Sequence, residues 1–263
     1  MAMTKPARIL AALVAACALA ATTTAQASDA VQPPAGAVRN IVLVHGAFAD
    51  GSSWSAVVKA LQRKGYRVTA VQNPLTSLAD DVAATRRVLA RQQGPVLLVG
   101  HSWAGAVITE AGNADNVKGL VYLSALVPDS GESVVDLLAR LNAPMEGLQP
   151  DAQGLVWLDD PEAYRQVMAG DVAPARARVL AATQQPISAS AFSGRISQAA
   201  WHGKPSWYLL TTQDNALAPR VQRRIASDIG AHVQSLASSH MSMISRPRAV
   251  ADFIGQAARS ATP

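Results

Sequence analysis

The sequence predicts an α/β fold in which a mostly parallel sheet carries helices on both faces. Short apolar runs rich in β-branched residues alternate along the chain with stretches that have helical spacing of apolar residues. Strands that are apolar throughout are typical of a sheet buried on both sides, and strand–helix alternation is typical of parallel pairing. A chain of 263 residues can form one such domain around one core.

The N-terminal segment has a different composition from the rest. Lys5 and Arg8 precede the apolar stretch ILAALVAACALAA, and the small residues AQA follow at 25–27. This order of a basic start, an apolar stretch and a small-residue cleavage site predicts a signal peptide over residues 1–27. We expect a tether over 28–39 and an exported protein, either periplasmic or secreted.

Cys17 is the single cysteine of the chain and lies inside this segment. Cleavage after Ala27 would leave a mature chain without any disulfide. The residues VAAC that end at Cys17 also resemble a lipoprotein processing box, which gives an alternative in which Cys17 is a lipidated anchor.

The charge balance is ordinary once this segment is set aside. Without Lys5 and Arg8 the chain has 21 basic and 18 acidic side chains. The arginines near the C-terminus have helical spacing without interleaved aromatic residues, which indicates a solvated helix face rather than a nucleic-acid site. Beyond residue 30 no apolar run approaches the roughly 20 residues of a membrane span, so we expect no stable membrane insertion of the mature chain.

The domain begins with a strand, a loop and a helix. The run IVLV at 41–44 predicts a buried strand, and the glycine-containing stretch HGAFADGSSW predicts a loop after it. A helix follows, with Ser52 or Ser53 as its cap and Gly65 as its end, and YRVTAVQ at 66–72 is the next strand.

The same alternation continues to the end of the chain. Residues 77–94 predict a helix capped by Ser77, with acidic residues in the first turn and arginines towards the end, as the helix dipole favours. The remaining predictions are strands at 95–100, 117–124, 205–212 and 232–237, and helices at 104–112, 220–230 and 246–259.

Residues 129–203 interrupt this pattern. Proline, glycine and short helical pieces such as ESVVDLLARLN and PEAYRQVMAG replace the strands there. We interpret about 130–203 as a small, mainly helical cap inserted into a domain that covers 40–263.

The stretch VLLVGHSWAGAVITEAG contains the strongest chemical signal. A serine hydroxyl is a weak nucleophile that needs a base, a group that orients the base, and donors for the developing oxyanion. Ser102 lies at a strand-to-helix junction between Gly100 and Ala104, which matches the G-x-S-x-G turn with one conservative change. This turn exposes the serine, so Ser102 is the predicted nucleophile.

The loop after the first strand, His45-Gly46-Ala47-Phe48, can lie beside this turn. Backbone N–H groups of Ala47 and Trp103 would then form the oxyanion hole. We interpret His45 as a structural loop residue.

The acid and the base are expected after later strands. Asp214 follows the strand at 205–212 and His240 follows the strand at 232–237, which gives the chain order Ser, Asp, His. Asp129, after another strand, is an alternative acid. We expect a helix surface for Asp228 and surface or core positions for His202 and His232.

Cofactor motifs are absent from the sequence. There is no HxxxH or CxxC motif, no cluster of carboxylates and no G-x-G-x-x-G loop. We therefore expect no metal site and no dinucleotide-binding loop.

Taken together, these motifs resemble the α/β-hydrolase family over roughly residues 40–258, and its compact esterase and hydroxynitrile lyase branch in particular. The resemblance implies an α/β-hydrolase fold with a sheet of about six strands, a helical cap and no cofactor. Similar hydroxynitrile lyases carry threonine and lysine where this chain has Gly46 and Met241, which favours an esterase.

The function expected from this resemblance is a serine carboxylesterase-type hydrolase that acts on a small-molecule ester through an acyl-enzyme. A lactone- or amide-directed hydrolase, a hydroxynitrile lyase and a non-catalytic ligand receptor on the same fold remain alternatives. Apolar residues of the cap and the neighbouring loops are expected to line the substrate pocket: Phe48, Leu137, Leu138, Trp157, Phe192, Trp201 and Met241.

Overall fold

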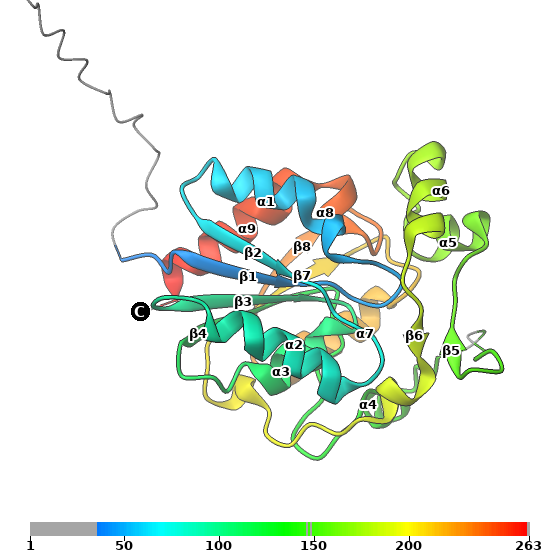
Figure 1. The fold of residues 1–263 in the computed structure, drawn as a ribbon, viewed down its shortest axis with the longest axis horizontal. Coiled ribbons are helices and arrows are strands. Elements are labelled where there is room, and N and C mark those ends of the chain that lie inside the picture. Colours follow the sequence, from blue (N-terminus) through cyan, green and yellow to red (C-terminus); the bar gives the residue numbers. More distant parts are fainter. Residues whose placement is uncertain (1–35, 146, 148, 262–263) are drawn as a thin grey trace, which may run out of the picture. The chain divides into compact units, whose positions relative to one another are not determined.

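Six parallel strands form the central sheet of the computed structural model, which describes residues 36–145, 147 and 149–261 (Figure 1). The order across the sheet is β2-β1-β3-β4-β7-β8. The strands are β1 (Asn40–Val44), β2 (Arg67–Val71), β3 (Val96–His101), β4 (Val117–Leu123), β7 (Ser206–Thr211) and β8 (His232–Leu236). The predicted α/β-hydrolase fold with about six strands is confirmed. The predicted signal peptide, Cys17 and most of the tether lie outside the described residues.

Helices cover both faces of this sheet. On one face α1 (Ser55–Gln62), α8 (Ser242–Ser245) and α9 (Pro247–Ser260) lie together, and on the other α2 (Leu78–Ala90) packs against α3 (Ala104–Ala111) (Figure 1). Helix α7 (Pro219–Asp228) connects β7 to β8. No helix among the described residues has the length and apolarity that a bilayer span requires.

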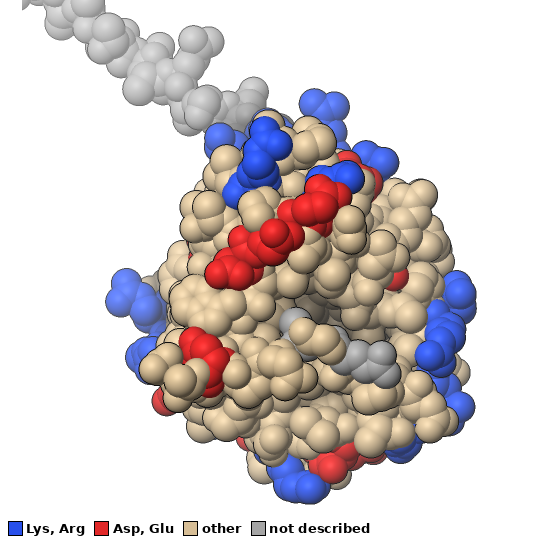
Figure 2. Space-filling view, turned by 90° about the vertical axis from the view of Figure 1, so that its right-hand side faces the viewer, with Lys and Arg blue, Asp and Glu red and all other residues tan. Residues whose placement is uncertain are grey.

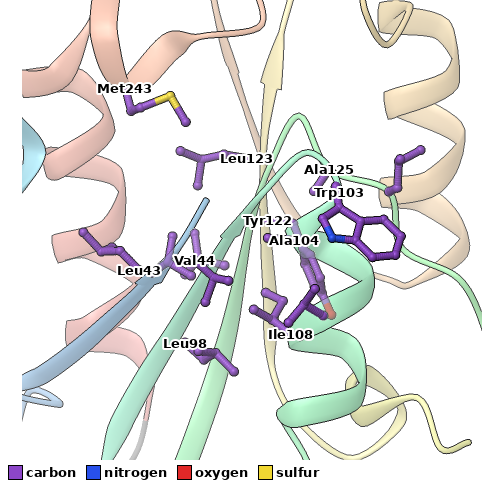
Figure 3. Packing of buried hydrophobic residues seen from close by; sticks show 14 of the residues in the cluster. Leu43, Val44, Leu98, Trp103, Ala104, Ile108, Tyr122, Leu123, Ala125 and Met243 are labelled. Carbon is purple, nitrogen blue, oxygen red and sulfur yellow. The ribbon is translucent and has the colours of Figure 1, made fainter. Parts of the chain in front are cut away.

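The core lies between the sheet and these helices. β1 and β3 are buried along their whole length, as expected for central parallel strands. Figure 3 shows side chains of these strands, among them Leu43 and Leu98, together with Ile108 of α3. Because chain neighbours of Ser102 belong to this packed core, the turn that carries Ser102 has a rigid base.

The start of the first helix differs from the prediction. A 3-10 turn, η1 (Gly51–Trp54), precedes α1, and the carboxylate of Asp50 accepts the Ser52 N–H at 2.6 Å. Asp50 is therefore the cap in place of Ser52 or Ser53, because its side chain satisfies a free N–H of the first turn. Ser77 caps α2 as predicted, accepting the Asp80 N–H at 3.0 Å.

The segment between β4 and β7 contains short helices and also a small sheet that the sequence did not indicate. The helices are α4 (Val134–Arg140), α5 (Pro161–Val167), α6 (Pro174–Thr183), η2 (Ala189–Ser193) and η3 (Ala200–His202). Two-residue strands, β5 (Leu155–Val156) and β6 (Ile187–Ser188), pair antiparallel. Strands this short carry no readable alternation, so the sequence could not reveal them.

Candidate active site

Ser102 lies in a strained turn between β3 and α3. Its φ of 54° is in the left-handed region, which a non-glycine residue rarely occupies. The turn is held by the Ser102 N–H donating to Leu123 O at 3.1 Å and by the Gly105 N–H donating to Ser102 O at 2.9 Å. A Cβ at Gly100 would lie 2.7 Å from Ala104 O, so only glycine allows strand and helix to approach this closely. This is the strand–turn–helix geometry of a nucleophile elbow.

The loop after β1 lies directly against this turn. A Cβ at Gly46 would lie 2.8 Å from the Cβ of Ser102, so the predicted proximity of the two segments is present. The His45 ring is buried and bonded on both sides, with Nδ1 2.9 Å from Gly46 O and Nε2 accepting the Asn73 N–H at 2.9 Å. Burial lowers the pKa of His45. His45 thus fixes the loop that carries Ala47.

Asp214 and His240 form a buried pair at the same edge of the sheet. The Nδ1 atom of His240 lies 2.7 Å from Oδ2 of Asp214, after the ends of the neighbouring strands β8 and β7. Oδ2 also accepts bonds from Thr211 Oγ1 at 2.7 Å and from Gln222 Nε2 at 2.9 Å. The other carboxylate oxygen accepts the N–H groups of Ala216 at 2.9 Å and Leu217 at 2.8 Å. These bonds fix the Asp214 carboxylate in a position from which it can orient the imidazole of His240.

The alternative acid and bases have other partners. Asp129 lies 2.7 Å from Nε2 of His202 in an exposed pair, and the His202 ring stacks on Trp201. Asp228 pairs with Arg140 and Arg224 on the surface. His232 is exposed at the start of β8. The structure therefore brings Asp214, and not Asp129, to His240.

His101 supports the loop that carries His240. Its Nε2 donates to the backbone carbonyl of His240 at 3.0 Å, and the two rings lie 4.7 Å apart. Burial holds the pKa of His101 well below its usual value, and the nearby His240 lowers it further. A neutral His101 is compatible with a neighbouring imidazole that becomes positively charged during a reaction.

A cavity of about 660 Å³ joins these groups. Ser102, His240, Ala47 and Trp103 all line it, together with apolar residues of the cap such as Leu138. Of the described residues that line it, Arg220 is the one with a permanent charge. The cap side of the molecule is hollowed in Figure 2, and most side chains around the hollow are uncharged. The volume and the apolar lining are those of a small-molecule site.

No hydrogen bond joins the Ser102 hydroxyl to the His240 ring among the described residues, although both side chains line this cavity. Catalytic hydrogen bonds of this kind often form fully only when substrate is bound.

The predicted pocket residues divide into two groups. Phe48, Leu138 and Phe192 line the cavity. Trp157 instead is 43% exposed and donates its indole N–H to Asp151 at 2.8 Å. The other three that lie outside the lining are Trp201, which donates to Pro128 O at 3.2 Å, the buried Leu137, and Met241, which is buried at the start of α8. The prediction for these four is corrected, because each packs or bonds elsewhere.

Asp81 is a site neighbour that the sequence analysis missed. It is fully buried in α2, and Oδ2 accepts the indole N–H of Trp103 at 2.7 Å. Burial raises its pKa to about 6, although the bond from Trp103 acts in the opposite direction. Asp81 lies three residues after Leu78 on the buried side of α2, but an acidic residue in a first helical turn is also what the helix dipole favours, so the sequence did not distinguish it.

Among the described residues there is no group of three or more His, Cys, Asp and Glu side chains that could hold a metal ion. The site brings a serine hydroxyl, an imidazole and a carboxylate together at one edge of the sheet.

Known hydrolases and esterases are similar to this chain in sequence or in fold. A pyrethroid hydrolase from Sphingobium wenxiniae is 29% identical over 254 residues, which cover 82% of this chain and 86% of that protein. A carbendazim hydrolyzing esterase from Nocardioides is 36% identical over 119 residues, covering 40% of this chain and 49% of the relative. The crystal structure of polyneuridine aldehyde esterase has the same fold, with a TM-score of 0.72, 20% identity and coverage of 83% of this chain and 98% of that one. The profile of the alpha/beta hydrolase family matches residues 41–253, and the chain belongs to this family.

Proposed function

We propose that the protein is a serine esterase that hydrolyses small or medium apolar esters through an acyl-enzyme. The observation that carries the proposal is the buried 2.7 Å contact between His240 Nδ1 and Asp214 Oδ2, with His240 and Ser102 lining one cavity. The names of the pyrethroid hydrolase and the carbendazim hydrolyzing esterase also support an ester-hydrolysing enzyme.

Acylation begins with attack of Ser102 Oγ on the ester carbonyl carbon. Nε2 of His240 takes the hydroxyl proton, and Asp214 stabilises the imidazolium that forms. The carbonyl oxygen becomes an oxyanion, which the N–H groups of Ala47 and Trp103 stabilise. When the tetrahedral intermediate collapses, the bond to the alcohol breaks and His240 returns the proton to the leaving alkoxide.

Deacylation repeats these steps with water as the nucleophile. His240 takes a proton from water, and the hydroxide oxygen attacks the acyl carbon of the ester on Ser102. Collapse of the second intermediate releases the carboxylic acid, and the proton returns to Ser102 Oγ. The sum of the two halves is one ester and one water converted to one acid and one alcohol.

The lining of the cavity supports an apolar substrate. Phe48, Leu138 and Phe192 surround the space next to Ser102. A cavity of about 660 Å³ accommodates more than an acetyl ester. Lactones and activated amides can react by the same route. Turnover of esters, lactones and an anilide by the same protein distinguishes these substrate classes.

Cyanohydrin cleavage has less support. Met241 is buried and is not among the residues that line the cavity, and Gly46 is required by its close approach to Ser102. Neither residue supplies the hydroxyl or ammonium group that the similar lyases use.

The test is turnover of a p-nitrophenyl ester series of graded acyl length, with several lactones, an anilide and mandelonitrile, by wild type and by Ser102→Ala. We expect ester hydrolysis that Ser102→Ala lacks, without cyanide release. Serine-dependent cyanide release would support a lyase, and ligand binding with no turnover above the variant would support a receptor.

We also propose export, with cleavage after Ala27. The basic, apolar and small-residue order of residues 1–27 supports it. N-terminal sequencing of the exported protein is the test: a start at Ser28 is expected, and a blocked terminus at Cys17 would identify a lipid anchor instead.

A further inference from the structure

Asp81 holds a buried carboxylate that the proposed reaction does not use. Both of its oxygens have partners: Oδ1 accepts the Leu75 N–H at 2.8 Å, and Oδ2 accepts the Trp103 indole N–H at 2.7 Å. Burying a carboxylate is costly, because water is lost from the ion. An apolar residue would satisfy packing at this position without that cost, which points to a role for the oxygen atoms.

The Leu75 side of Asp81 is a fixed piece of backbone. Leu75 has a φ of 57°, and its carbonyl accepts the N–H of Ser188 in the cap strand β6 at 2.9 Å. Gln185 donates to the carbonyls of Asn73 at 3.1 Å and Pro74 at 2.6 Å. The anchor of the Asp81 carboxylate is therefore tied to the cap.

The other partner of Asp81, Trp103, lies at the cavity that contains Ser102. Trp103 follows Ser102 in the chain and lines the cavity. Its ring meets Phe192 of the cap edge to face, with centroids 5.2 Å apart. Trp103 and Phe192 are both lining residues of the cavity, and we call this pair the aromatic wall.

We propose that Asp81 is a positioning residue that fixes the Trp103 indole and so sets the selectivity of the site for esters with a long apolar chain. This inference rests on the proposed esterase function. The carboxylate holds the indole by a charge-assisted bond, which is stronger than a bond between neutral groups. Without it the indole can turn and Phe192 loses its partner, so the space for a long apolar chain is no longer kept open.

The test compares Asp81→Asn with Asp80→Asn. Asp80 is the adjacent carboxylate of the same helix, and it bonds to Ser77 and Thr76 rather than to Trp103. The readout is the ratio of kcat/KM for p-nitrophenyl octanoate to that for the acetate. We expect Asp81→Asn to lower this ratio by about three- to tenfold, mainly through a higher KM for octanoate, which is the range for one aromatic contact. Asp80→Asn should leave the ratio unchanged.

A double-mutant cycle with Trp103→Phe separates positioning from general destabilisation. Phenylalanine has no N–H for Asp81, so Asp81→Asn should change the ratio little in that background. An equal loss for both esters, or the same factor for Asp81→Asn in both backgrounds, would overturn the proposal. If Asp81→Asn does not fold, Trp103→Phe alone must lower the ratio.

A binding measurement keeps this inference separate from the proposed function. Binding of p-nitrophenyl octanoate is compared between Ser102→Ala and the double variant that also carries Asp81→Asn. Calorimetry should show weaker binding with Asp81→Asn by a similar factor, whether or not the wild type turns over esters. Equal binding would contradict the role of Asp81. Absence of Ser102-dependent turnover would contradict only the esterase proposal.

Discussion

The His240 imidazole is held between two fixed groups, with its Nδ1 2.7 Å from Asp214 Oδ2 and its backbone carbonyl accepting the His101 Nε2–H at 3.0 Å. The Asp214 carboxylate fixes the orientation of the His240 ring. The bond from His101 fixes the position of the loop that carries His240. This double restraint leaves Nε2 as the ring atom available for proton transfer in the cavity.

Asp214→Asn should lower kcat by several hundredfold or more, by analogy with the orienting acid of serine proteases. The amide can no longer stabilise the imidazolium, while the surrounding bonds change little. Steady-state kinetics on a p-nitrophenyl ester provide the measurement. Asp129→Asn is the matched control, because Asp129 pairs with the exposed His202. A larger loss in Asp129→Asn than in Asp214→Asn would reverse the assignment.

Gly46→Ala should lower kcat by about 100-fold, the effect of losing one oxyanion donor. The added methyl group would lie 2.8 Å from Ser102 Cβ, so the loop with Ala47 must move. Gly203→Ala is the control, since no atom lies within 4 Å of a Cβ there. Wild-type kcat in Gly46→Ala would show that the loop does not supply a donor.

Leu138→Phe should shift preference towards short acyl chains. Leu138 lines the cavity from α4, and the larger ring fills space that a long chain needs. Relative to the acetate, we expect kcat/KM for the octanoate to fall by about tenfold. Val135→Phe makes the same change at a position of α4 that is 45% exposed, and it should have no such effect. The same shift in both variants would place the acyl pocket elsewhere.

Asp81 should also make stability depend on pH in an unusual direction. Burial raises its pKa from 3.8 to about 6, so the folded state binds this proton more tightly than the unfolded state. Its contribution to stability is therefore present below about pH 4 and is lost as the pH rises through about 6.

The measurement is chemical denaturation of wild type and Asp81→Asn between about pH 4 and 7.5. The free energy of unfolding of wild type relative to the variant should be about 2 kcal/mol greater at the acidic end. Asp80→Asn should show no such gain, because bonds from Ser77 and Thr76 lower the pKa of Asp80. A difference that does not change with pH would show that Asp81 does not titrate in this range.

The fold and the placement of the main site residues could be predicted because both depend on local patterns. Ser102 and Asp214 each follow a buried strand, β3 and β7, whereas His240 follows β8, an exposed edge strand that the alternation of strands and helices predicted. Parallel strands present their carboxyl ends at one edge, so spacing in the chain was enough to bring these residues together.

The cavity lining depends on tertiary contacts that no local pattern records. Trp157 and Trp201 are large and apolar, but each bonds to a neighbour outside the cavity. Arg220 and Asn215 line the cavity although neither type indicates a pocket in sequence. Asp81 resembles an ordinary acidic residue of a first helical turn, and only the approach of Trp103 gives it a partner in the site.

The most direct test of acylation at Ser102 is the mass of the protein after brief exposure to a slowly deacylated ester, followed by peptide mapping. We expect one acyl group per chain, located on Ser102, and no label in Ser102→Ala. An acyl group on another residue, or ester turnover that persists in Ser102→Ala, would contradict it.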